Sequence, residues 1–174
     1  MSDNKKLLQT IRTADDFRAC AYALESEAAE RYAELADQME VHNNREVAAL
    51  FRKMAEIEGK HIDLVLAGRP RPAIASSMAF WLGRDGAETI ATEDLHYLMT
   101  PHHALTLALK GEQNAAAMFE TLAAQAPDPT VRRLAAEMAA EEREHIELIK
   151  VWLAKFPEPD ADWHDDPDPP VFSE

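Results

Sequence analysis

Cysteine is almost absent from this chain of 174 residues, which contains only Cys20. A single cysteine excludes an internal disulfide and any metal site built from four thiolates. Any metal chemistry must therefore use other ligands. Cys20 lies opposite the apolar face of the first predicted helix, so we expect an exposed thiol without a catalytic role.

Long apolar runs and basic patches are also missing. No run reaches about 18 apolar residues, and the first residues lack the apolar segment of a signal peptide, which predicts a cytoplasmic protein without a membrane partner. The formal net charge is -14. Because such a surface repels phosphate backbones, nucleic acid is not expected as a partner.

Glycine is scarce, with five residues, whereas hydrophobic residues make up 47% of the chain. Stretches rich in Ala, Leu, Glu and Lys favour helix over strand, and the length suits one domain, so we predict an all-α fold. Apolar residues recur at helical spacing in four segments. The predicted helices run from Thr13 to about Val41, from Asn43–Asn44 to just before Gly68, from about Pro101 to Pro127, and from about Thr130 to Phe156.

The connections between these helices predict the topology. Short links make two antiparallel hairpins, and the roughly 30 residues between the hairpins can cross the length of a bundle, as in ferritin-like four-helix bundles. The second and third helices are then parallel. We expect a short helix within 92–99 and apolar cover for one flank from 78–82. Residues 1–156 are assigned to the bundle and 157–174 to an extended, acidic, proline-rich tail.

Two predicted helices contain the pattern Glu-x-x-His: Glu58 with His61, and Glu142 with His145. Residues three apart share a helix face, so each pair can offer a carboxylate and an imidazole to one ion. About one such match is expected by chance. Both pairs nevertheless fall within the apolar stripe of their helix, where a solvated charge is not expected.

The other two helices each place one carboxylate on the apolar face, Glu25 in the first and Glu112 in the third. Burying four ionised carboxylates without partners would cost several kcal/mol each. Two divalent ions would supply the compensating charge, and mixed carboxylate and imidazole ligands suit iron or manganese. Each hairpin thus contributes a lone Glu and a Glu-x-x-His in the same order, which predicts a pseudo-twofold axis through a metal pair.

Simpler interpretations stay open for single residues. Glu25 or Glu112 alone could form a salt bridge at a helix edge, and Glu141 could replace Glu142 as a ligand. Four further residues are interpreted as surface or capping residues: Glu93, His96, His102 and His103.

Four stretches share a pattern with a known family: LESEAAERY around Glu25, FRKMAEIEGKH up to His61, ALKGE up to Glu112 and AEEREH up to His145. Jointly they resemble the rubrerythrin-related, ferritin-like di-iron carboxylate proteins, over about residues 13–156. The resemblance implies Glu58 and Glu142 as bridging carboxylates and Tyr32 as a tyrosine behind the ligands at the catalytic site. It implies two iron ions, replaceable by manganese or zinc, and six ligands: Glu25, Glu58, His61, Glu112, Glu142 and His145.

The resemblance also implies an oxidoreductase whose reduced iron pair reacts with hydrogen peroxide or dioxygen. Two features depart from the family. Rubrerythrins proper carry another glutamate three residues after the ligand in the third helix, where this chain has Ala115, and this puts their ligand exchange in doubt. They also carry a four-cysteine rubredoxin domain, so this chain would need an external electron donor.

Other functions are compatible with the same ligands. A ferroxidase centre would make this an iron-handling protein, and a metal-binding module without turnover is a second alternative. A manganese catalase is a weaker one, since sequence does not fix the metal. We expect a homodimer, because rubrerythrin-like proteins are usually dimers.

Overall fold

The computed structural model describes residues 3–73 and 100–159. This part of the chain is all-helical and has no strand. The short helix expected within 92–99, the apolar residues of 78–82, Glu93, His96 and residues 160–174 of the tail lie outside the described residues. The helices are α1 (Asp3–Thr10), α2 (Ala14–Val41), α3 (Arg45–Leu66), α5 (Pro101–Gln125) and α6 (Pro129–Leu153).

The starts of the predicted helices are confirmed, and side chains cap them. Thr13 Oγ1 accepts a hydrogen bond from the backbone N–H of Asp16 at 3.1 Å. Asp16 in turn accepts one from the backbone N–H of Thr13 at 2.9 Å, so a reciprocal capping box begins α2. Asp128 begins α6 by accepting a hydrogen bond from the backbone N–H of Thr130 at 2.6 Å. These caps satisfy backbone donors that the first helical turn leaves without partners.

The helix ends also follow local chemistry. After α3, Ala67 and Gly68 have φ values of 47° and 75°. Ala67 is the left-handed residue that ends α3, and Gly68 continues this conformation without steric cost, so the helix stops where the sequence predicts. Helix α6 ends at Leu153, before the predicted end at Phe156, whose backbone N–H closes a final turn onto the carbonyl of Leu153 at 3.1 Å.

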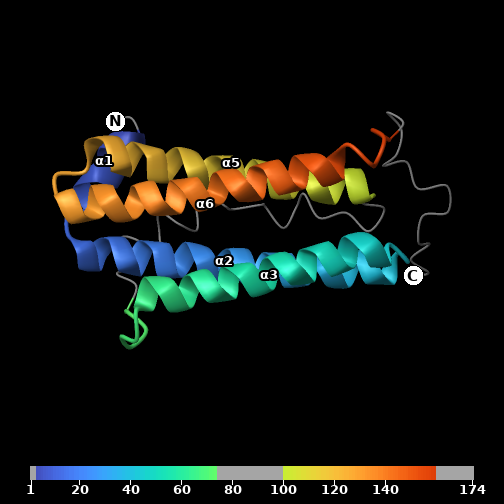
Figure 1. Cartoon of the computed structure of the whole chain (residues 1–174), viewed down its shortest axis with the longest axis horizontal. Helices are drawn as coiled ribbons and strands as arrows, with labels where there is room; N and C mark the ends of the chain where they lie inside the picture. The colour runs from blue at the N-terminus through green and yellow to red at the C-terminus, as the bar shows by residue number, and fades with distance from the viewer. Residues whose placement is uncertain (1–2, 74–99, 160–174) are drawn as a thin grey trace, which may run out of the picture.

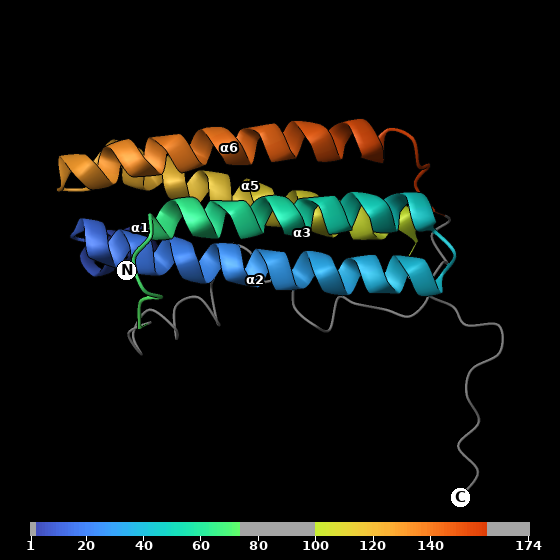
Figure 2. The same ribbon diagram turned by 60° about the horizontal axis from the view of Figure 1, so that its bottom comes forward.

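The long helices form two antiparallel hairpins, α2 with α3 and α5 with α6, which lie side by side in both views (Figures 1 and 2). Helices α3 and α5 run in the same direction (Figure 1), so the second hairpin starts at the opposite end of the bundle from where the first one stops. The predicted ferritin-like helical bundle is confirmed. None of the helices in residues 3–73 and 100–159 combines the length and the apolar character that crossing a membrane requires.

Helix α1 is not among the predicted helices, and it explains why the prediction for Cys20 is wrong. The Cys20 side chain is buried, with 1% of its surface exposed. Leu7 of α1 and Ile11, directly after it, are also buried and belong to the same apolar cluster as Cys20. This amino-terminal segment, whose helix packs mainly against α5, thus enlarges the apolar cluster in which Cys20 is buried.

The apolar core consists of two clusters separated by a polar layer. On α2, Phe17 to Leu24 belong to one cluster and Ala28 to Met39 to the other. Helix α5 repeats the division, with Ala104 to Ala108 in the second cluster and Ala115 to Leu122 in the first. Glu25 and Glu112 lie at the two boundaries, so the polar residues of the core meet near the middle of the bundle.

Candidate metal centre

All six predicted ligands are buried, and the four long helices deliver them to the polar layer between the apolar clusters. Their exposed fractions range from 1% to 8%. On α3 and α6, the spacing of three places each histidine beside the glutamate of its own pattern. The buried polar and charged residues of the described chain are these six: Glu25, Glu58, His61, Glu112, Glu142 and His145.

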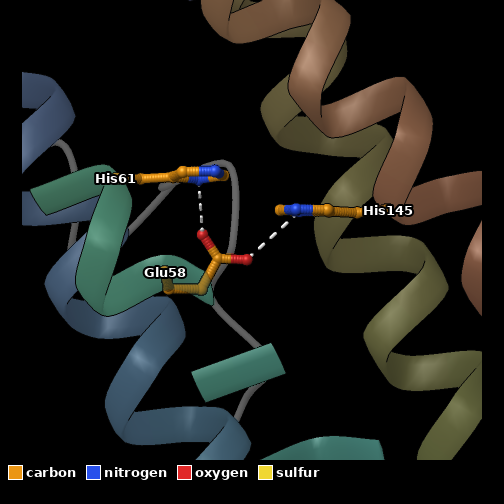
Figure 3. Close-up of side chains that lie close together, drawn as sticks. All are labelled: Glu58, His61 and His145. Atoms are coloured by element: carbon orange, nitrogen blue, oxygen red, sulfur yellow. Dashed lines mark hydrogen bonds and ion pairs between the residues drawn. The ribbon is translucent and has the colours of Figure 1, made fainter. Parts of the chain in front are cut away.

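Glu58 lies between the two histidines (Figure 3). Its Oε2 is 3.2 Å from Nδ1 of His61, and its Oε1 is 3.1 Å from Nδ1 of His145. The two imidazole rings are nearly parallel, with centroids 5.3 Å apart. One carboxylate from the first hairpin therefore reaches histidines of both hairpins, the geometry that a bridging carboxylate requires.

The second hairpin supplies a matching set of donors. Nδ1 of His145 lies 3.3 Å from Oε2 of Glu112 and 3.6 Å from Oε2 of Glu142. Two groups of three donors each have their ligand atoms within 4.8 Å of one another: Glu58, His61 and His145, and Glu112, Glu142 and His145. Both histidines thus turn Nδ1 toward the carboxylates.

Glu25 completes the first half of the cluster, with Oε2 at 3.4 Å from Nδ1 of His61. Neither oxygen of Glu25 has a hydrogen-bond partner among the described residues, although the side chain is 1% exposed. A buried polar group without a partner costs about 1–3 kcal/mol. A cation bound between Glu25, Glu58 and His61 would remove that cost.

The pKa values show how the cluster balances its charge without metal. Burial raises the pKa of Glu25 well above its usual 4.5, and the neighbouring carboxylates raise it further. Burial and the nearby Glu112 likewise raise the pKa of Glu142, against the opposing effect of His145. For Glu58, burial favours the neutral form, but hydrogen bonds with His145 and His61 outweigh it and lower the pKa to about 2.

The histidine pKa values move in the complementary direction. Burial alone would lower both, but contacts with Glu58 raise the pKa of His61, and contacts with Glu112, Glu142 and Glu58 raise that of His145. Protons bound to these side chains therefore offset the negative charge of the carboxylates. Divalent cations could offset the same charge in their place. Carboxylate and imidazole donors that converge in a buried layer suit iron or manganese, so these residues fit the metal pair that the sequence predicts.

Tyr32, predicted to lie behind the ligands, donates a hydrogen bond from its hydroxyl to Oε1 of Glu112. The Tyr32 side chain is 4% exposed, and its ring stacks on that of Phe51 with centroids 5.8 Å apart. Glu112 thus has the phenol on one oxygen and His145 on the other. This pairing orients the carboxylate toward the cluster.

Replacing Tyr32 by phenylalanine should therefore destabilise the protein. The substitution keeps the ring stacked on Phe51 but leaves one oxygen of Glu112 without its donor, which typically costs about 1–3 kcal/mol. Urea unfolding of the metal-free protein measures this loss. Tyr22→Phe, at a half-buried position of the same helix, is the matched control, and an equal loss in both variants would contradict the role assigned to the Tyr32 hydroxyl.

The other candidate residues that the structure describes, Glu141, His102 and His103, are not among the six buried ligand candidates. Glu142 rather than Glu141 belongs to the buried cluster, since the Glu141 side chain is 38% exposed. His103 caps α5 as predicted, because Thr100 donates its backbone N–H to Nδ1 of His103 at 3.3 Å. The adjacent His102 is half-buried, with Nδ1 at 3.1 Å from the carbonyl oxygen of Phe156.

One contact of the cluster was not predicted from the sequence. Oε2 of Glu141 lies 3.5 Å from Nε2 of His61, on the side of the ring opposite Nδ1. The only sequence signal for it was the position of Glu141 at the edge of the apolar stripe of α6.

The comparison with known families gives the same interpretation as the geometry. The family model described as Rubrerythrin matches residues 16–67 and 103–168, which is more than half of the chain and includes all six buried ligand candidates. The chain belongs to the rubrerythrin family. The matched segments omit residues 68–102 and include nearly all of the four helices that carry the cluster, and the second segment continues past α6 to residue 168.

A solved structure is similar to this rubrerythrin-family chain. It is the crystal structure of an uncharacterized conserved protein from Magnetospirillum magnetotacticum MS-1, with 41% sequence identity and a TM-score of 0.69. The similarity covers 85% of this chain and 98% of that one. The search among curated proteins found no match.

Proposed function

We propose that this protein is a di-iron oxidoreductase of the rubrerythrin type, which reduces hydrogen peroxide or reacts with dioxygen. The observation that carries the proposal is the buried cluster of four carboxylates and two imidazoles within a rubrerythrin-family domain. The proposed ligands are Glu25, Glu58 and His61 from the first hairpin and Glu112, Glu142 and His145 from the second. Glu58 and Glu142 are the proposed bridging carboxylates.

Each part of the cluster has a task in this proposal. An iron pair would supply the electrons for reduction of the oxidant. The histidines would hold the ions through Nδ1, and Glu58 would join the two halves, since it lies within 3.2 Å of both Nδ1 atoms. The two apolar clusters above and below the polar layer exclude bulk water, which strengthens electrostatic interactions inside the site.

We propose that a separate donor supplies the electrons. Cys20 is the only cysteine in the chain, so the sequence given holds no four-cysteine site from which electrons could reach the cluster. The partners in the proposal are hydrogen peroxide or dioxygen and a separate electron donor. We further propose a cytoplasmic homodimer.

Iron handling is the second candidate function, because Ala115 puts the ligand exchange of rubrerythrins proper in doubt. This residue is buried and has no carboxylate, at the position where rubrerythrins proper carry an additional glutamate. A site of six ligands could oxidise ferrous iron with dioxygen and pass the product on. A metal-binding module without turnover is the third candidate.

Oxidation of the reduced, iron-loaded protein separates these candidates. We expect hydrogen peroxide to oxidise the iron pair faster than dioxygen does, followed by near-ultraviolet absorption in stopped flow, with Glu58→Ala as the inactive control. Rapid oxidation by dioxygen, with repeated turnover of added ferrous iron, would favour the ferroxidase instead. If neither oxidant reacts with two bound irons, the protein is a metal-binding module and the proposed oxidoreductase activity is wrong.

A further inference from the structure

The two halves of the cluster have similar predicted ligands. They differ in the side chains near Nε2 of each histidine, the ring nitrogen that does not face the other ligands. Glu141 lies on α6, four residues before His145, and its Oε2 is 3.5 Å from Nε2 of His61. The corresponding residue of the first hairpin, four residues before His61 on α3, is Ile57. Because isoleucine has no hydrogen-bond acceptor in its side chain, the same contact cannot be made to His145 from that position.

The contacts of His145 agree with this difference. Among the described residues, the carboxylates near His145 all approach its Nδ1: Glu58 at 3.1 Å, Glu112 at 3.3 Å and Glu142 at 3.6 Å. His61 has carboxylates on both nitrogens, with Glu25 and Glu58 at Nδ1 and Glu141 at Nε2. Within residues 3–73 and 100–159, a carboxylate thus lies near Nε2 of the histidine at one of the two predicted metal positions and not at the other.

Glu141 also connects this half of the cluster to the surface. Its side chain is 38% exposed, whereas that of His61 is 10% exposed. Glu141 lines a groove of about 410 Å³ between α2, α3 and α6, together with Phe17, Leu64 and Met138 among other residues. The Glu141 carboxylate therefore lies between the groove and the imidazole of His61.

We propose that Glu141 is a positioning residue, which holds His61 with its proton on Nε2 and Nδ1 toward the metal and so sets the affinity of one metal position only. A carboxylate that accepts the second N–H of a ligand histidine fixes the tautomer, orients the ring and makes the metal-binding nitrogen more basic. Glu141 does so for the position formed by Glu25, Glu58 and His61. In the part of the chain that the structure describes, no carboxylate supports Nε2 of His145 in this way.

This inference rests on the proposed metal site, and zinc titration of the full chain tests the two separately. Zinc suits the measurement because it binds the same donors without redox chemistry. With a competing chelator, Glu141→Ala should bind one zinc as tightly as the unsubstituted protein does and the other about 10- to 100-fold more weakly. Glu141→Gln keeps an oxygen that accepts the Nε2 proton, so it should recover part of this loss.

A matched control comes from the same helix and the same groove. Glu137 lies one turn before Glu141, lines the groove and pairs with Arg133 at 2.7 Å. Glu137→Ala removes an equal charge from the surface and should leave both zinc affinities unchanged. Histidine ¹H–¹⁵N spectra of the zinc-loaded Glu141→Ala variant should show changed signals for His61 and unchanged signals for His145.

The results of these titrations test the role of Glu141 separately from the existence of the metal site. Zinc binding at two positions in every variant with unchanged affinities would overturn the role of Glu141 while keeping the metal site. An equal loss in Glu137→Ala and Glu141→Ala would also overturn it, since the effect would then be one of surface charge. If the unsubstituted protein binds no metal, the proposed function itself is wrong.

Discussion

Replacing Glu58 by alanine is expected to lower the metal content from about two ions per chain to less than one. Glu58 is the carboxylate that lies within 3.2 Å of Nδ1 of both histidines. Its loss removes a ligand from each metal position at once. Elemental analysis of protein purified from cells grown with iron measures this change.

The same substitution should destabilise the metal-free protein. Glu58 is 1% exposed and is the carboxylate whose pKa His145 and His61 lower to about 2. Removing one partner of a buried ion pair leaves the other charge uncompensated, which costs about 3–5 kcal/mol. Glu56→Ala, at an exposed position of the same helix, is the matched control. Two metal ions retained in Glu58→Ala would contradict the ligand assignment.

Metal-free and metal-loaded protein should respond to pH in opposite directions. The folded pKa values of Glu25 and Glu142 are raised well above 4.5, so their contribution to the free energy of unfolding is lost as pH rises through them. Those of the two histidines are raised above 6.5, and their contribution also falls at higher pH. Glu58 has the opposite effect, because its contribution to the free energy of unfolding is lost as pH falls from 4.5 toward 2. The metal-free protein should therefore be most stable near pH 5 and less stable at pH 8.

Metal reverses this trend because it competes with protons for the same atoms. Binding of two divalent ions should release up to four protons, two from His61 and His145 and two from Glu25 and Glu142. Metal affinity and the stabilisation it gives therefore rise with pH. Zinc at 100 to 1,000 times its Kd would add about 3–4 kcal/mol per site, or about 5–15 °C in Tm.

Thermal unfolding with and without zinc between pH 5 and pH 8 measures both trends. We expect the increase in Tm on adding zinc to be small at pH 5 and to grow steadily toward pH 8. Proton release in weak buffer at pH 7 provides the independent count. An increase in Tm that is constant over this range, or larger at pH 5, would contradict the protonated cluster.

Much of the bundle and the membership of the buried cluster were predictable from sequence, because both depend on helical periodicity. Glu25 and Glu112 were identifiable because each interrupts an apolar stripe, and a buried carboxylate needs a compensating charge. The capping box at Thr13 and the left-handed residue Gly68 fixed helix boundaries through local chemistry alone. Such signals act within a few residues and need no knowledge of the neighbouring helices.

Features that depend on packing between helices were not predictable in the same way. Helix α1 has only a few apolar residues to mark it, so the burial of Cys20 by the segment before α2 was missed. The contact between Glu141 and His61 depends on how α6 is rotated against α3. The partner of Tyr32 is Glu112, which is 80 residues away in sequence, and only the assembled bundle brings the two together.

Anomalous diffraction at the iron edge from crystals of the iron-loaded protein would locate the metal ions among the six buried side chains. We expect two anomalous peaks within the polar layer, one contacted by Nδ1 of His61 and the other by Nδ1 of His145, with Glu58 reaching both. A single peak, or none among these six side chains in iron-loaded crystals, would contradict the two-metal site.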